Sequence, residues 1–175
     1  MATVNIILSR PFNLLAFNLL WLGCVLGREQ LLWLVAPLVI AYSALLVGSG
    51  RVTIYQLAIP LLLGVSADTL LTVAGVFQFN NTILFIPLWL TVLWLAFATT
   101  LTQSLQWLGK HKLVAAAIGA VVVPFNYAVG ERLGAVSFPG DYLFTILLLG
   151  ALWALLLPLL FTIVENLAGK LYATN

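Results

Sequence analysis

Long apolar segments separated by short polar connections dominate this sequence of 175 residues. Apolar runs of about 20 residues are long enough to cross the hydrocarbon core of a bilayer as α-helices. Charged residues make up only 7% of the chain, whereas roughly a quarter of the residues of a soluble protein are charged. The pattern therefore predicts an all-α membrane protein, with room for about six spans and no separate soluble domain.

The polar connections divide the chain into six expected membrane helices that form a single domain, residues 1–175. We expect these helices at residues 11–27, 31–49, 53–78, 82–108, 113–130 and 141–165. Ser9 and Asp141 are side chains suited to cap the first and the last helix. Arg28 and Glu29 form a polar turn between the first two helices.

Basic residues are distributed unevenly over the expected connections. Six helices place both termini on one side of the membrane, and the basic residues expected on that side are Arg10, Arg51, Lys110, Lys112 and Lys170. Only Arg28 and Arg132 lie on the other side. Because cytoplasmic connections of membrane proteins are enriched in lysine and arginine, we expect a six-helix transmembrane bundle with both termini in the cytoplasm.

A carboxylate lies inside the apolar segment PLLLGVSADTLLTVAG, residues 60–75. Pro60, Gly64, Asp68, Thr72 and Gly75 recur at spacings of three or four residues, so they share one face of a helix. An ionised side chain within a membrane helix costs at least a few kcal/mol and usually faces a bundle interior or a wet cavity. Asp68 therefore marks the candidate functional site.

The residues that we assign to a candidate ligand-binding site are Asp68, Thr72, Trp94, Asn126, Tyr127 and Arg132. We expect a polar, outward-opening pocket around Asp68, which would bind a cationic or hydroxylated group or a proton. Asn126 and Tyr127 would supply hydrogen bonds. Trp94 would form an apolar wall, and Arg132 would supply a counter-charge.

Depth in the membrane brings these residues together. With a rise of ~1.5 Å per residue, Asp68 lies about 25 Å from the cytoplasmic end of its helix, Asn126 about 21 Å and Arg132 about 30 Å. The alternative is structural: Asp68 pairs with Arg132 or Arg28 and ties two helices together, as intramembrane charges often do. The sequence leaves the pocket and the structural pair open.

Few groups suited to catalysis are present. Single histidine and cysteine residues, His111 and Cys24, exclude an intramolecular disulfide, a cysteine metal cluster and a bis-histidine haem within one chain. Asp68 is the only deep carboxylate, which excludes a pair of intramembrane aspartates. We expect no catalytic residue, no metal ligand and no cofactor, although a lipid-modifying enzyme that works with Asp68, Glu131 and Arg132 stays open.

The expected partners follow from charge and hydropathy. A net charge of +2 without any Lys/Arg-rich run argues against a nucleic-acid partner. The lipid bilayer surrounds the chain, and the expected ligand is a small amphipathic or lipid-like molecule that is bound or transported. Trp21, Trp94 and Trp153 lie deep enough to wall an apolar cavity. The competing hypothesis is a scaffold or accessory subunit of a membrane lipid-modifying system, with a membrane protein as its partner.

Four stretches are distinctive in combination: NLLAFNLLWLGCVLG (13–27), GVSADTLL (64–71), FIPLWLTVLWLAFATTLTQSLQWL (85–108) and GERLGAVSF (130–138). Through them the chain resembles, over nearly its whole length, a bacterial inner-membrane family known as domain of unknown function 2878. The resemblance implies a multi-pass protein of the bacterial cytoplasmic membrane without an established activity, and it favours a lipid-related role. In architecture alone the chain is similar to substrate-binding subunits of energy-coupling-factor transporters, whose partner surface the small residues at 115–120 would imitate.

Overall fold

The computed structural model describes residues 2–80 and 85–172, and the regular elements in those two stretches are all helical. They are α1 (Ala2–Ile7), α2 (Arg10–Gly48), α3 (Ile54–Val73), α4 (Leu88–Thr102), the 3-10 helix η1 (Gln106–Lys110), α5 (Lys112–Arg132) and α6 (Tyr142–Tyr172). The helices α2, α3, α5 and α6 are long and apolar enough to cross a membrane, and α4 is apolar but shorter. The all-α membrane fold expected from the sequence is confirmed.

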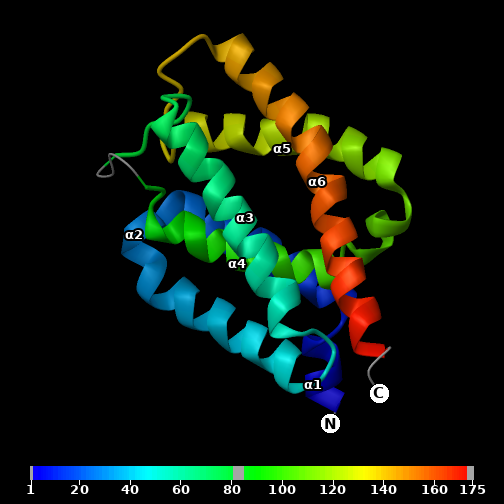
Figure 1. Ribbon diagram of the computed structural model, residues 1–175. Coiled ribbons are helices and arrows are strands. Elements are labelled where there is room, and N and C mark those ends of the chain that lie inside the picture. The colour runs from blue at the N-terminus through cyan, green and yellow to red at the C-terminus, as the bar shows by residue number, and fades with distance from the viewer. Residues whose placement is uncertain (1, 81–84, 173–175) are drawn as a thin grey trace.

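The helix α2 is a helical hairpin, because the chain reverses at the expected turn (Figure 1). Arg28 leaves the helical conformation with φ 45° and ψ −129°. The two halves then pack antiparallel: the rings of Phe12 and Tyr42 lie 6.1 Å apart between centroids. Nearer the turn, Gly23 gives the side chain of Val35 room to approach. The separate helices expected at 11–27 and 31–49 are therefore the two halves of α2.

Side-chain caps begin the first and the last of the long helices, α2 and α6. The Ser9 hydroxyl accepts a hydrogen bond from the Phe12 amide at 3.3 Å, and an Asp141 carboxylate oxygen accepts one from the Phe144 amide at 2.7 Å, as expected for N-caps. The helix expected at 53–78 ends earlier, at Val73. Gly75 adopts φ 75° there and closes a Schellman turn, which satisfies the last carbonyl groups.

The helix expected at residues 82–108 is wrong in both bounds. Its first residues, 82–84, lie outside the described residues, and α4 begins only after Pro87, which lacks the N–H that a helix interior needs. The helix ends at Thr102 because Gln103 turns away with φ −120° and ψ −93°. The last expected helix, in contrast, continues beyond Glu165 to Tyr172.

The helices form two groups joined by α6. In one group α4 packs against both α2 and α3, and in the other α5 packs along α6 (Figure 1). Glycines bring α5 and α6 close together, since a Cβ at Gly119 would overlap the Trp153 carbonyl group and one at Gly150 would lie 3.0 Å from the Ala120 oxygen. Ala115 is also fully buried. Ala115 and Gly119 of the small-residue run at 115–120 therefore pack inside the chain, whereas Ala117 of the same run is exposed.

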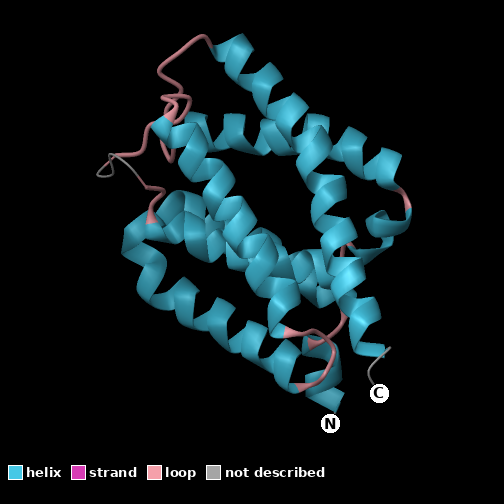
Figure 2. Ribbon diagram, in the orientation of Figure 1, coloured by secondary structure: helices cyan, strands magenta, loops and turns pink. Residues whose placement is uncertain are grey.

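Polar contacts tie both ends of the bundle. At the end that contains α1, Arg51 donates to the Leu8 carbonyl oxygen at 2.6 Å. At the opposite end, the loops after α3 and α5 lie side by side and form an antiparallel bridge between Gln78 and Ser137 (Figure 2). The turn of α2 joins that end through a hydrogen bond from Arg28 Nη2 to the Leu133 oxygen, 2.6 Å long.

Candidate functional site

The carboxyl group of Asp68 is buried where three helices meet, and only 1% of the residue is exposed. Its Oδ2 accepts a hydrogen bond from Trp94 Nε1 at 2.7 Å, and its Oδ1 accepts one from the Tyr127 hydroxyl at 2.7 Å. These bonds link α3 to α4 and to α5. Buried polar groups need such partners, because each unpaired one costs about 1–3 kcal/mol.

Neither candidate arginine pairs with Asp68. Among residues 4–80 and 85–169, whose side chains the structure describes, there is one ion pair, which joins Lys112 Nζ to Glu165 Oε2 at 2.7 Å. Arg132 is exposed, and Arg28 bonds to a backbone carbonyl group. Arg132 therefore does not supply the expected counter-charge to Asp68. The alternative, a structural ion pair between Asp68 and Arg132 or Arg28, is also wrong. Neutral donors on two aromatic side chains take that place, and they satisfy the carboxyl group without burying a second charge.

An apolar cavity of about 330 Å³ lies beside this carboxyl group, between the first half of α2 and the helices α4, α5 and α6. Trp94 and Tyr127 are part of its wall, whereas Asp68 does not line it. Asp68 therefore lies behind the wall and holds two of its side chains in place. The polar pocket expected around Asp68 is instead an aromatic cavity whose wall the aspartate supports.

Contacts with other aromatic rings also hold Trp94 and Tyr127 in the wall of the cavity. Trp94 stacks on Trp153 of α6 with ring centroids 5.4 Å apart and planes 6° from parallel. Tyr127 stacks on Phe77 at 5.1 Å. Gly64 makes room for the Trp94 indole, because a Cβ at that position would overlap the ring. Such pairs contribute about 0.5–1.5 kcal/mol each beyond the area they bury, so they hold Trp94 and Tyr127 in position in the wall.

The structure brings together only part of the candidate set. Trp94, Asn126 and Tyr127 line the cavity. Asn126 is exposed, while the Thr72 hydroxyl donates to the Asp68 carbonyl oxygen one turn back in its own helix, at 2.8 Å. The deep tryptophans Trp21 and Trp153 also line the cavity.

Several lining residues were missed by reasoning from the sequence. They include Phe79, Trp89, Phe97, Gly130 and Ala135. Phe79 and Ala135 lie in loops, where helical periodicity gives no signal. The only available signal was the density of aromatic residues around Trp89 and Phe97, which by itself does not distinguish a cavity wall from a packed core.

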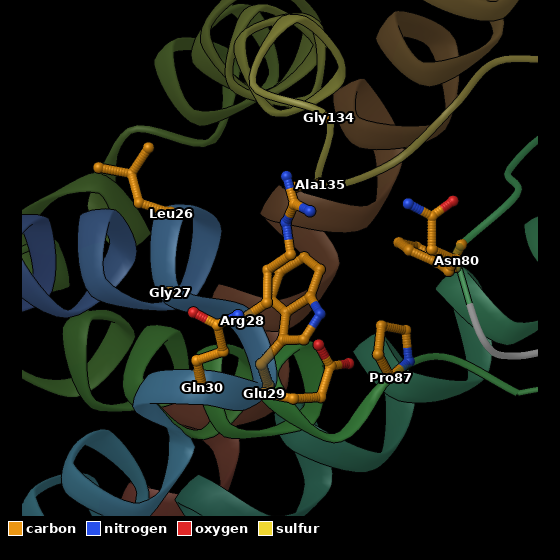
Figure 3. A pocket seen from close by; sticks show the side chains of 11 residues that line it. Leu26, Gly27, Arg28, Glu29, Gln30, Asn80, Pro87, Gly134 and Ala135 are labelled. Atoms are coloured by element: carbon orange, nitrogen blue, oxygen red, sulfur yellow. The ribbon is translucent and has the colours of Figure 1, made fainter.

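A second, polar pocket of about 250 Å³ adjoins the cavity at the turn of α2. Arg28, Glu29 and Gln30 line it from the turn, and Asn80 lines it from the loop after α3 (Figure 3). Phe79, Trp89 and Ala135 line both spaces. The sequence analysis used Arg28 and Glu29 only as a turn and a topological signal, because nothing in their spacing shows that distant loops converge on them.

The lining of the cavity is mostly apolar and aromatic, with few polar side chains. Among the described residues no three His, Cys, Asp or Glu side chains lie close enough together to hold a metal ion. Both oxygens of Asp68 are occupied by side chains of the wall. The arrangement is suited to holding an apolar group against aromatic surfaces, with polar groups at one end.

Comparison with known proteins identifies one family. The family model described as a protein of unknown function (DUF2878) matches residues 10–159. No curated protein and no solved structure matches the chain.

Proposed function

We propose that this chain, which belongs to the DUF2878 family, binds a small amphipathic or lipid-like molecule in the apolar cavity between α2, α4, α5 and α6. The observation that carries the proposal is a cavity of about 330 Å³ with a fixed aromatic wall. Ligand sites are commonly ~300–1,000 Å³ in volume, mostly apolar and preformed, with a few polar groups that orient the ligand. The cavity would hold the molecule for binding or for transport.

The cavity rim supports entry from the bilayer. Leu14 and Asn18 line the cavity from α2, and Val122 and Asn126 line it from α5; all four are exposed. Asn18 donates to the Leu14 carbonyl oxygen at 2.8 Å, so its amide is held at the rim by its own helix. A lipid-like molecule that enters between α2 and α5 would keep its apolar part out of water throughout.

The proposed setting is the bacterial inner membrane, crossed six times with both termini in the cytoplasm. The two halves of α2, together with α3, α4, α5 and α6, would make the crossings. The distribution of charge supports this orientation. Arg10 bonds to Gln106 and Lys112 pairs with Glu165 at the end of the bundle that would face the cytoplasm. The polar pocket at Arg28 would then face the periplasm.

Blocking the cavity tests the proposed function. Gly130 lines it, and a Cβ added there would meet only Val136 Cγ1, at 3.9 Å. The variant Gly130→Leu should therefore keep the fold and fill part of the cavity. The matched control is Gly48→Leu, since Gly48 ends α2 with no atom near its Cβ position. Each protein would be extracted gently from its own membrane and examined by native mass spectrometry.

We expect wild type and Gly48→Leu to carry one tightly bound amphiphile per chain. Folded Gly130→Leu should bind the same molecule at least about tenfold more weakly, which corresponds to a loss of ~1.4 kcal/mol of binding free energy. Identical loading of all three proteins would contradict the proposal. So would an absence of retained molecules from all three. Either result would favour the scaffold or accessory-subunit alternative, and cross-linking to partner proteins would be the next measurement.

A further inference from the structure

The polar pocket at the turn of α2 adjoins the apolar cavity, and Phe79, Trp89 and Ala135 line both. A molecule that occupied both spaces would therefore have a polar part and an apolar part. The polar part would lie near Arg28 and Glu29, and the apolar part would lie against the aromatic wall. The inference below concerns the polar part, and it rests on the proposed function.

Arg28 is held in this pocket in an unusual backbone conformation. Its φ of 45° and ψ of −129° fall outside the regions that residues with a Cβ normally occupy. Side chains in such conformations cluster at ligand clamps and active sites. The conformation orients the guanidinium group toward Gly134 and Ala135 across the pocket (Figure 3).

The guanidinium group of Arg28 keeps unused donors. Nη2 donates to the Leu133 carbonyl oxygen at 2.6 Å. Nε is buried and has no hydrogen-bond partner among the described residues. A guanidinium group offers five N–H donors in a planar fork, which matches the oxygens of a phosphate or a carboxylate. Arg28 is therefore suited to bind an anionic group.

Glu29 gives the pocket a second charge of opposite sign. It lines the same pocket, and its carboxylate points toward Pro87, away from the guanidinium group (Figure 3). It forms no ion pair with Arg28 or with any other side chain among residues 4–80 and 85–169. Gln30 and Asn80 add two amide groups to the lining. A ligand that carried only negative charge would meet repulsion from Glu29.

We propose that the polar pocket binds the headgroup of a zwitterionic aminophospholipid. The phosphate group would lie at Arg28, and the primary ammonium group would lie at Glu29. An acyl chain would pass Phe79 and Trp89 into the apolar cavity. Charge complementarity on both groups distinguishes this ligand from an anionic phospholipid, which would satisfy Arg28 and leave Glu29 opposed to its charge.

Headgroup competition tests the proposal. Delipidated protein in detergent would be mixed with equal amounts of phosphatidylethanolamine, phosphatidylcholine and phosphatidylglycerol that share the same acyl chains, and bound lipids would be counted by native mass spectrometry. For wild type we expect phosphatidylethanolamine to exceed phosphatidylglycerol by about fivefold or more. Phosphatidylcholine should be intermediate, because its quaternary ammonium has no N–H to donate to Glu29.

Variants at the turn separate the two charges. Glu29→Gln should abolish the preference for phosphatidylethanolamine over phosphatidylglycerol. Arg28→Gln should lower the binding of both lipids about tenfold. Arg28→Gly should do the same, and because glycine adopts a positive φ without strain, relief of the backbone offsets part of the lost hydrogen bond to Leu133. Thermal unfolding of Arg28→Gly, measured beside wild type, would show that the variant that loses lipid is still folded.

The outcomes separate this inference from the proposed function. Equal binding of phosphatidylethanolamine and phosphatidylglycerol to wild type would overturn the headgroup assignment, and so would a preference that survives Glu29→Gln. If the headgroup preference were absent but Gly130→Leu bound less of all three lipids than wild type, the cavity would remain the binding site. If Gly130→Leu retained as much lipid as wild type, the proposed function would fail together with the inference.

Discussion

At the scale of single residues, Asp68 acts as an acceptor that organises aromatic side chains. A carboxyl group can accept from several donors at once, and here it accepts from an indole N–H and a phenol O–H at 2.7 Å each. Trp94 is buried and Tyr127 is partly buried, both among apolar side chains, where an unpaired N–H or O–H is costly. Asp68 thereby determines the orientation of two side chains of the cavity wall without lining the cavity itself.

Replacing this acceptor should cost stability in a graded way. In Asp68→Leu, Trp94 and Tyr127 lose their acceptor, so we expect the free energy of unfolding to fall by about 2–6 kcal/mol, at ~1–3 kcal/mol for each donor. In Asp68→Asn, the amide oxygen can accept from the indole while its NH₂ group donates to the phenol oxygen. The loss should then be about 1 kcal/mol. Unfolding by SDS or heat in detergent micelles would measure both.

The control is Ser66→Leu, at an exposed position on the same helix, which should change stability by less than about 0.5 kcal/mol. If the free energy of unfolding fell equally in Asp68→Asn and Asp68→Leu, the role of Asp68 as a hydrogen-bond acceptor would be contradicted. That result would show that its negative charge matters and its number of acceptor atoms does not.

At the scale of secondary-structure elements, close contact between α5 and α6 forms one side of the cavity. Gly119 and Gly150 allow the two backbones to approach, as small residues do at helix interfaces in membranes. Trp153 lies on α6 beside this contact and stacks on Trp94 of α4. The spacing of α5 and α6 therefore determines where the stacked indoles lie.

Adding one methyl group at this interface should separate the helices. In Gly119→Ala the new Cβ would overlap the Trp153 carbonyl group. We expect the free energy of unfolding to fall by about 1–3 kcal/mol, even though alanine is the better helix former. Gly48→Ala, where the Cβ position is open, should change it by less than about 0.5 kcal/mol. Thermal unfolding in detergent would compare the two, and equal effects would argue against a tight contact at Gly119.

At the scale of the whole molecule, the bundle has two chemically different ends. One end carries Arg10, Arg51 and Lys112. The other end carries the polar pocket and the bridge between Gln78 and Ser137. The apolar cavity adjoins the second end through the residues that both spaces share. A ligand with one polar end would therefore bind in a single orientation relative to the membrane.

Site-specific labelling would test this orientation. Cys24 is the only cysteine and is buried, so Cys24→Ala provides a background for single cysteines. In right-side-out spheroplasts, a membrane-impermeant maleimide should label Gly140→Cys directly, and Gly48→Cys only after permeabilisation. Both positions are exposed, with open space at Cβ. The reverse pattern would place the termini outside, and labelling of both from one side would contradict the six proposed crossings.

Apolar segment length and local caps were readable from the sequence. Ser9, Asp141 and the turn at Arg28 lie where local chemistry predicted them, because a cap involves residues only a few positions apart. The same local signals explain the errors: Gly75 and Pro87 are the residues that shorten the third and fourth helices. Family membership, suggested by four sequence stretches, is confirmed by the match to residues 10–159.

The partners of Asp68 were not readable in this way. An intramembrane carboxylate predicts a polar partner but does not specify which one, and the arginines proposed from charge and expected depth do not pair with Asp68. Trp94 and Tyr127 lie 26 and 59 residues away from Asp68, on helices whose rotation depends on packing around Gly64 and Gly119. The sequence by itself determined an all-α membrane protein with one buried carboxylate, because hydropathy and caps act locally. Only the tertiary structure decided which aromatic donors satisfy Asp68 and which cavity they enclose, because contacts between distant helices depend on how all of them pack together.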